Sequence, residues 1–202
     1  MDRVVPKVAG VESWELTFKL CRRWGYQVKG IPKDKAISNK NSKSVDTRKI
    51  VWDIVNKARK FLKKTQVIIP PGVELEISHH YGLKKFYEYG LMMLTIINED
   101  YCKKILITLP GQKHPEQYHK KKEETFHVLY GVVKLKLDGK EELLNPGDVA
   151  TILSGVKHSF SSETGSVIEE ISSTHFKDDS YYTDKTVMEN KKRKTFLAYW
   201  LE

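Results

Sequence analysis

The stretch HPEQYHKKKEETFHVLYG, residues 114–131, decides the fold, because three histidines and three glutamates surround a lysine run and an apolar pattern follows. Side chains of a β-strand alternate between its two faces. One face of the predicted strand therefore carries Glu124, Phe126, Val128 and Tyr130. His127 has the opposite phase, so we expect it to face away from the interior.

The lysine run at residues 120–122 is suited to a hairpin tip, where lysine side chains face water. On the strand before it, Gln117 and His119 point the same way. A hairpin would fold His119 back beside Glu124. The stretch therefore predicts that potential ligands separated by five positions converge at one end of a sheet.

Further short strand patterns extend outward on both sides of this stretch, separated by Asn-, Asp-, Pro- and Gly-containing turns. They read LMMLTIIN, KKILITLP, VVKLKLDG, VATILSG and SVIEEISS. Evenly spaced short strands with tight turns predict an antiparallel sandwich or barrel, and they argue against alternating strand and helix units.

The region before these strands predicts helices. Residues 11–24 have roughly helical apolar spacing, and residues 48–64 repeat apolar positions at intervals of three and four, with Lys and Arg opposite. We therefore predict a basic helical segment at 1–65 with a polar linker near 30–46. A β domain at 66–185 and a C-terminal extension at 186–202 follow.

The net charge of +9 is unevenly distributed. Residues 1–66 hold 17 Lys and Arg against 6 Asp and Glu, whereas the rest hold 18 against 20. The basic segment has no aromatic-interleaved motif of a known nucleic-acid reader, so we interpret it as a solvated surface and expect no nucleic-acid partner. A phosphate-driven interaction would be strongly salt-dependent.

No apolar run approaches the roughly 20 residues of a membrane helix, and the N-terminus lacks the apolar core of a secretory signal. We expect a soluble, cytoplasmic protein. Cys21 and Cys102 are far apart and have no CxxC spacing, which indicates neither a disulfide framework nor a cysteine zinc site. Both are interpreted as buried thiols.

One further histidine, His158, follows in NPGDVATILSGVKHSF, residues 145–160. Together with Gln117, His119 and Glu124 it makes a mixed nitrogen and oxygen set. Such a set suits a divalent first-row metal such as Mn, Fe, Ni or Zn.

These two blocks resemble the two motifs of the cupin superfamily. The first motif is a glycine, then HxH, three or four residues, Glu, six residues and Gly. Here Gly111 is followed by Gln117-Tyr118-His119, then Glu124 and Gly131. Pro146, Gly147 and His158 are similar to the second motif. The departure is Gln117 in place of the first histidine, which puts metal affinity and metal identity in question.

Within the superfamily, residues 66–185 look most like the small cupin domains that accompany bacterial N-acetylneuraminate synthase-type enzymes. They resemble D-lyxose isomerase-type sugar cupins more distantly. The likeness implies a mainly β, antiparallel double-stranded β-helix (a jelly-roll cupin barrel), a divalent metal at its mouth, and a sugar or sugar acid as ligand. Because cupins of this type commonly pair through edge strands, we expect a homodimer.

A shorter resemblance covers residues 9–36, which are similar to a segment of ornithine aminotransferase. In that family the matching positions, Gly10 and Val11, lie where a helix begins at the phosphate of pyridoxal phosphate. The remaining chain leaves no room for the large cofactor domain. We interpret the segment as a borrowed or coincidental helix.

The function that fits best is metal-dependent isomerisation or epimerisation of a sugar, in which a carboxylate moves a proton between carbons of an ene-diolate. Glu169 and Glu170 are the candidate bases, and only one of them can face the barrel. The apolar neighbours favour Glu169, and the pattern shared with sugar isomerase cupins favours Glu170, towards which we lean. Burial would raise the pKa of that base.

Several polar side chains are candidates for contacting the substrate. They are Lys113, His114, Tyr118 and Tyr130. His79 and His80 are interpreted either as surface residues or as a second approach to the pocket. A noncatalytic sugar-binding or regulatory module and a metal-dependent oxygenase remain the alternatives to an isomerase.

Overall fold

The computed structural model describes residues 42–198 and 200. The helix expected at 11–24, most of the expected linker and Cys21 lie outside the described residues. The long helix is α2, Ser42–Thr65. Three short helices follow later in the chain: η1 Leu83–Lys85, α3 Phe86–Tyr89 and α4 Lys185–Glu189. The strands are β1 Leu75–His79, β2 Gly90–Asn98, β3 Tyr101–Thr108, β4 Gln112–Tyr118, β5 Glu124–Tyr130, β6 Val133–Leu137, β7 Lys140–Leu144, β8 Val149–Ile152, β9 His158–Ser162, β10 Ser166–Ser173, β11 Tyr181–Tyr182 and β12 Lys194–Leu197.

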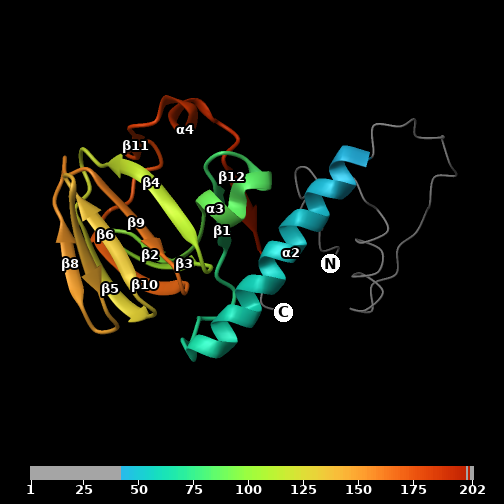
Figure 1. Ribbon diagram of the computed structural model, residues 1–202, viewed down its shortest axis with the longest axis horizontal. Helices are drawn as coiled ribbons and strands as arrows, with labels where there is room; N and C mark the ends of the chain where they lie inside the picture. The colour runs from blue at the N-terminus through green and yellow to red at the C-terminus, as the bar shows by residue number, and fades with distance from the viewer. Residues whose placement is uncertain (1–41, 199, 201–202) are drawn as a thin grey trace, which may run out of the picture. The chain divides into compact units, whose positions relative to one another are not determined.

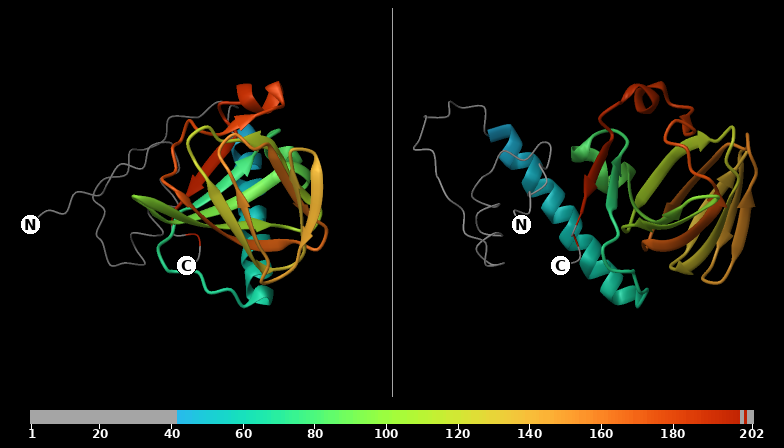
Figure 2. Two further views of the ribbon diagram at one scale, coloured as in Figure 1. Left: turned by 90° about the vertical axis from the view of Figure 1, so that its left-hand side faces the viewer. Right: turned by 180° about the vertical axis from the view of Figure 1, so that it is seen from behind.

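Two antiparallel sheets face each other, as Figures 1 and 2 show. The larger has the order β12-β1-β2-β3-β10-β5-β8, and the smaller has the order β11-β4-β9-β6-β7. Because β10 lies between β3 and β5, and β9 lies between β4 and β6, the chain passes repeatedly from one sheet to the other. This is the predicted jelly-roll arrangement, and the mainly β fold is confirmed for the described residues.

The space between the sheets is filled by alternate side chains of both, as a period of two requires. Leu106, Phe126 and Ile168 come from the larger sheet, and Leu135 and Phe160 come from the smaller one. This core fills the part of the barrel next to the candidate site. It therefore fixes the strands that carry the site residues.

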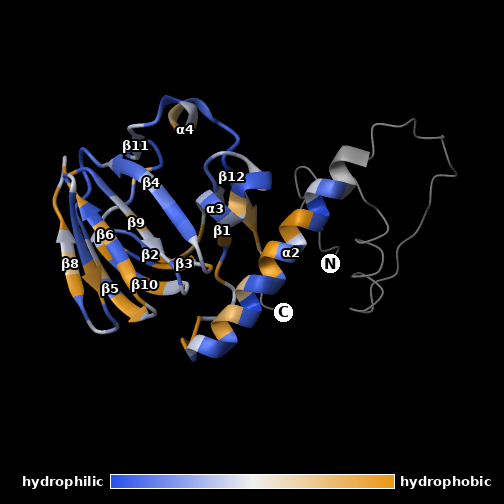
Figure 3. Ribbon diagram, in the orientation of Figure 1, coloured by the Kyte–Doolittle hydropathy of each residue, from blue (hydrophilic) through white to orange (hydrophobic). Residues whose placement is uncertain are grey.

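Helix α2 packs on the outer face of the larger sheet. Its buried side chains recur at helical spacing and include Ile54, Ala58 and Phe61. They lie against the outward-facing residues of β1, β2 and β3, such as Ile77 and Leu94. Figure 3 shows apolar and charged residues interspersed along this helix. The predicted helix at 48–64 therefore exists, but it begins at Ser42, inside the expected linker.

The expected hairpin at residues 120–122 is wrong. Strand β4 pairs with β9 and β11 in the smaller sheet, whereas β5 pairs with β10 and β8 in the larger one. The connection between β4 and β5 therefore crosses from one sheet to the other. Convergence of His119 and Glu124 results from this crossing and not from a tight turn.

The stretch that we expected to be a C-terminal extension contributes to the larger sheet, because β12 pairs with β1 along Leu75–Ser78. The domain boundaries remain a prediction. None of the helices between residues 42 and 200 combines the length and the apolar character that crossing a membrane requires.

Candidate metal centre

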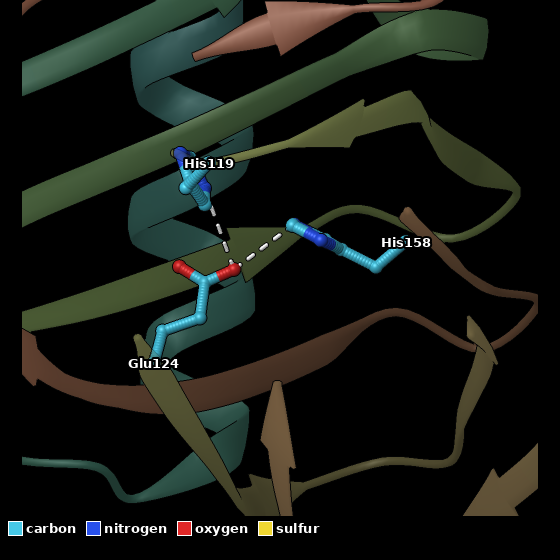
Figure 4. A group of neighbouring side chains, drawn as sticks. All are labelled: His119, Glu124 and His158. Carbon is cyan, nitrogen blue, oxygen red and sulfur yellow. Dashed lines mark ion pairs between the residues drawn. The ribbon is translucent and has the colours of Figure 1, made fainter. Parts of the chain in front are cut away.

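Three potential metal ligands point toward one another, as Figure 4 shows. His119 follows β4, Glu124 begins β5 and His158 begins β9. All three are buried, and their ligand atoms lie within 4.8 Å of one another. Glu124 Oε1 is 2.9 Å from His158 Nε2 and 3.5 Å from His119 Nε2. Residues from both sheets therefore present one carboxylate and two imidazoles to a common point.

Hydrogen bonds to main-chain carbonyls orient the two imidazole rings. His119 Nδ1–H donates to the carbonyl oxygen of Asp179 at 2.5 Å, and His158 Nδ1–H donates to that of Val156 at 3.2 Å. A neutral imidazole that donates through Nδ1 keeps a lone pair on Nε2. Both Nε2 atoms therefore face Glu124 as acceptors, which is the arrangement that a cation between them requires.

Gln117 completes the group. Its Nε2 atom is 3.5 Å from His119 Nε2 and 3.3 Å from His158 Nε2. Its Oε1 atom is buried and has no hydrogen-bond partner among the described residues. Rotating the amide by 180° would exchange the two atoms and direct the oxygen to the imidazoles. The donor set of two imidazoles, one carboxylate and one amide oxygen fits a divalent first-row metal.

Lys122 lies within the site, contrary to the expectation that all three lysines of the run face water. Its ammonium group contacts Glu124 Oε2 and lies 2.8 Å from Glu170 Oε1. Burial lowers the pKa of Lys122, but the two carboxylates outweigh burial, so its pKa lies above the ordinary value. A charged ammonium group therefore links the carboxylate of a potential metal ligand, Glu124, to the candidate base.

Glu170 faces the barrel interior and is buried, whereas Glu169 faces outward. On the outer side Glu169 pairs with Lys103 at 2.7 Å and with His127 at 3.2 Å. The structure therefore brings Glu170, and not Glu169 or His127, into the cavity that the potential ligands His119 and Glu124 line.

The expected upward shift in the pKa of Glu170 is wrong. Burial raises this pKa, but the ammonium groups of Lys122 and Lys104 together outweigh burial and hold it below the ordinary value. Lys104 Nζ is 3.5 Å from Glu170 Oε1. The carboxyl group is therefore ionised at neutral pH and available to accept a proton.

A neutral, hydrogen-bonding wall lies beside this charged group. His80 Nδ1–H donates to the carbonyl oxygen of Tyr89 at 2.7 Å, so its Nε2 accepts from the Tyr182 hydroxyl at 3.1 Å. Burial lowers the pKa of His80 to about 4 and holds that of His114 well below its ordinary value. The ring of His114 stacks on Phe160, with 4.7 Å between centroids. This wall offers uncharged partners for hydroxyl groups.

One cavity is lined by two of the potential metal ligands, His119 and Glu124, by Glu170, and by His114 and Tyr182 of the neutral wall. Its charged or hydrogen-bonding lining residues are Ser78, Lys104, His114, Gln117, His119, Lys122, Glu124, Glu170, His175, Ser180, Tyr182 and Lys194. The structure does not bring three expected substrate contacts to this cavity. Lys113 is exposed, Tyr118 stacks on Tyr181, and Tyr130 packs edge-on against Phe61 of α2. Tyr118 alternates with Gln117 and therefore faces away from the cavity. Strict alternation is interrupted near the other two residues, by a register shift between His114 and Gln117 on β4 and by one opposite the end of β5, between Val167 and Ile168.

Sequence reasoning missed Lys104, Lys122 and Tyr182. A signal for Lys122 exists, because it has the same period-two phase as Glu124 and Phe126, which face inward. Lys104 has a similar signal, since it alternates with Leu106 on β3. Tyr182 comes from the two-residue strand β11, and such a short strand has no periodicity to read.

Known proteins similar to this chain include ornithine aminotransferase, as the resemblance of residues 9–36 predicts. The chain is 54% identical over 35 residues to ornithine aminotransferase from Geobacillus sp., which is 17% of this chain and 9% of that enzyme. So small a share of the aminotransferase carries no aminotransferase function to this chain.

The comparisons with cupins cover far more of the chain. A cupin domain family matches residues 105–169. The chain is 30% identical over 167 residues to the D-lyxose/D-mannose isomerase of Thermosediminibacter oceani, covering 68% of this chain and 92% of that enzyme. L-ribose isomerase from Cellulomonas parahominis has the same fold, with a TM-score of 0.60 at 12% identity, covering 71% of this chain and 95% of that structure. The chain therefore belongs to the cupin superfamily and, within it, to the D-lyxose isomerase-type sugar cupins.

Proposed function

We propose that the protein is a metal-dependent ketol-isomerase that interconverts an aldose and a ketose, with a pentose or hexose such as D-lyxose or D-mannose as substrate. The observation that carries this proposal is the placement of Glu170. An ionised, buried carboxylate lies in the same cavity as His119 and Glu124, and Lys122 joins it to Glu124. The relatives named D-lyxose isomerases support the class of reaction.

The metal would be held by His119, Glu124 and His158, with Gln117 as a fourth ligand through its amide oxygen. A divalent metal bound there would polarise the carbonyl oxygen and the neighbouring hydroxyl of the sugar. This donor set suits Mn, Fe, Ni and Zn alike, because amide and carboxylate oxygens favour the harder ions and the imidazoles favour the softer ones.

Glu170 would move the proton between carbons. Its carboxylate removes the proton from C2 of the aldose, and the electron pair of the broken C–H bond forms the C1–C2 double bond of an ene-diolate. Returning the same proton to C1 gives the ketose, while the proton of the C2 hydroxyl passes to the oxygen on C1. Lys122 would orient the Glu170 carboxylate and keep it ionised, because its ammonium group pairs with Glu170 and Glu124.

The neutral wall would bind the remaining hydroxyl groups. The Tyr182 hydroxyl donates its proton to His80 Nε2. The lone pairs of the tyrosine oxygen are then available to a sugar hydroxyl. His114 stays neutral because it is buried, so it offers a hydrogen bond without a charge. Small-molecule sites typically have apolar walls that carry a small number of polar groups in fixed positions.

The test is an isomerisation assay of protein reconstituted with Mn²⁺. It measures ketose formation from D-lyxose, D-mannose and L-ribose. Glu170→Gln is expected to lower kcat by about 10³-fold, because general acid–base catalysis contributes roughly 10² to 10⁴. Glu169→Gln is the matched control, since this neighbour faces outward, and its kcat should stay within about twofold. Equal turnover in the parent and in Glu170→Gln would contradict the proposal.

The second candidate function is a noncatalytic sugar-binding or regulatory cupin. Gln117 favours it, because an amide oxygen is a weaker ligand than the imidazole of the usual motif. A binding module would take up sugar, measured by calorimetry, and form no ketose from any of the three substrates with Mn²⁺ present. The link to N-acetylneuraminate synthase-type cupins, the homodimer and the cytoplasmic location stay predictions.

A further inference from the structure

One buried aspartate outside the ligand group holds the chain that connects β4 to β5. Asp179 belongs to the segment between β10 and β11, and only 2% of its surface is exposed. Its carboxylate accepts three successive main-chain N–H groups. Lys120 N–H donates to Oδ1 at 3.0 Å, Lys121 N–H to Oδ2 at 3.0 Å, and Lys122 N–H to Oδ2 at 3.0 Å. Consecutive N–H groups that converge in this way form a concave site for an anion.

The main chain of the same residue holds a metal ligand. The carbonyl oxygen of Asp179 accepts the Nδ1–H of His119 at 2.5 Å, which leaves Nε2 as the lone-pair donor towards the metal. Partners of the second ring nitrogen fix the tautomer and the orientation of a ligating histidine. Asp179 therefore contacts the site through both its side chain and its main chain.

Both the side chain and the main chain of Asp179 contact residues that the proposed reaction uses, Lys122 and His119. The crossing 119–123 connects a strand of one sheet to a strand of the other, so contacts outside the strand ladders must fix its path. Gly155 N–H and the Ser154 hydroxyl fix its start, because they donate to the carbonyl oxygens of His119 and Lys120, each at 2.7 Å. Asp179 fixes its path directly before Glu124. The consequence is that Lys122 points inward, to 2.8 Å from Glu170, while Lys120 and Lys121 stay exposed.

We propose that Asp179 is the positioning residue of the metal centre, which sets the His119 tautomer and the inward path of Lys122 at once. The proposal rests on the metal-dependent function given above and deepens it. Loss of the carboxylate releases the three N–H groups, so the crossing and the Asp179 carbonyl shift together. The metal then loses a well-oriented imidazole even though every ligand residue is still present.

The experiment compares Mn²⁺ binding by the parent, Asp179→Asn and Asp178→Asn, measured by electron paramagnetic resonance of free Mn²⁺. Asp179→Asn keeps the size of the side chain but removes its charge. Its NH₂ group cannot accept a hydrogen bond from the main-chain N–H groups. We expect the dissociation constant to rise by 10- to 100-fold, as for other partners of metal ligands. Asp178 is the exposed neighbour, so its variant should bind within about twofold of the parent.

Two spectroscopic readouts separate positioning from general loosening. The ¹⁵N NMR shifts of the His119 ring in metal-free protein should show protonation at Nδ1 in the parent and a mixture of tautomers in Asp179→Asn. In the parent alone, the amide protons of Lys120, Lys121 and Lys122 should exchange slowly despite their place in a connecting loop. This second readout needs no variant, so it holds even where Asp179→Asn does not fold.

The outcomes distinguish the two proposals. No Mn²⁺ binding by the parent overturns the metal-dependent function and the positioning role together. Binding by the parent that Asp179→Asn matches within twofold, with the His119 tautomer unchanged, overturns the positioning role alone. Rapid exchange of the three lysine amides in the parent does the same.

Discussion

Lys122 shows at the scale of one residue how neighbouring charges determine the chemistry of the site. Its ammonium group and that of Lys104 together outweigh the effect of burial on Glu170, whose pKa lies below the ordinary value for this reason. Removing one partner of a buried charge group leaves the other charges uncompensated and typically costs about 3 to 5 kcal/mol. The lysine therefore contributes both to the stability of the site and to the ionisation of the base.

We expect Lys122→Met to raise the pKa of Glu170. The lysine stabilises the carboxylate form, so its loss leaves burial and the neighbouring Glu124 to favour the protonated form. Glu170 would then take up its proton at a higher pH as the solution is acidified. A ¹³C NMR titration of the side-chain carboxyl measures this directly, and Lys121→Met is the exposed control. An unchanged titration in Lys122→Met would show that Lys104 alone holds the pKa down.

At this scale the sequence predicts ligands better than it predicts their surroundings. Gln117, His119, Glu124 and His158 follow from motif spacing, and the structure brings all four together. The ionised state of Glu170 depends on Lys122 and Lys104. Alternation places each lysine on an inward face, but both are distant from Glu170 in the sequence, so no local pattern reveals the three-way contact. Asp179 was missed because its role is a set of main-chain contacts that composition does not encode.

The turns between strands show which elements tolerate change. Gly131 and Gly139 both have positive φ, +76° and +88°, so any other residue at either position is strained. A Cβ atom on Gly131 would lie 2.1 Å from the carbonyl oxygen of Gly165, whereas one on Gly139 would meet nothing within 4 Å. The end of β5 and the turn before β10 are therefore packed backbone to backbone.

We expect Gly131→Ala to lower the free energy of unfolding by about 3 kcal/mol or more, since a backbone clash adds to the strain at positive φ. Gly139→Ala carries only the strain, roughly 1 to 2 kcal/mol. Urea denaturation of both variants measures the difference. Equal losses would mean that the turn at Gly165 moves aside freely.

Individual strands could be predicted from alternation, but their partners could not. The pattern 124–130 gives β5 and its inward face, yet nothing local shows that β4 belongs to the other sheet. The hairpin prediction failed for that reason. Strand β12 was missed for a similar reason, because its pairing with β1 joins residues more than a hundred positions apart.

Buried neutral histidines link the stability of the whole molecule to pH. The folded-state pKa of His80 is about 4, below the ordinary 6.5, because burial disfavours the charged ring. Between these values the unfolded chain binds a proton that the folded protein does not. The free energy of unfolding should therefore fall as pH is lowered from about 6.5 to 4, by up to about 3 kcal/mol from this group, and change little further below.

Denaturation at several pH values measures this dependence. His114 and His175 act in the same direction, since burial lowers the pKa of both, so the contribution of His80 is isolated with His80→Gln. The slope of the unfolding free energy against pH reports the number of protons taken up on unfolding. In the variant this number should be smaller by about one. An unchanged slope would contradict the neutral state assigned to His80.

The central claim is that a metal bound in the barrel makes this protein a sugar isomerase. The most direct measurement titrates Mn²⁺ into metal-stripped protein and follows ketose formation from D-lyxose and D-mannose at each addition. The account predicts no turnover without metal and a rise that saturates at about one equivalent per chain. Turnover that is independent of Mn²⁺, or one bound equivalent without any ketose from either sugar, would contradict it.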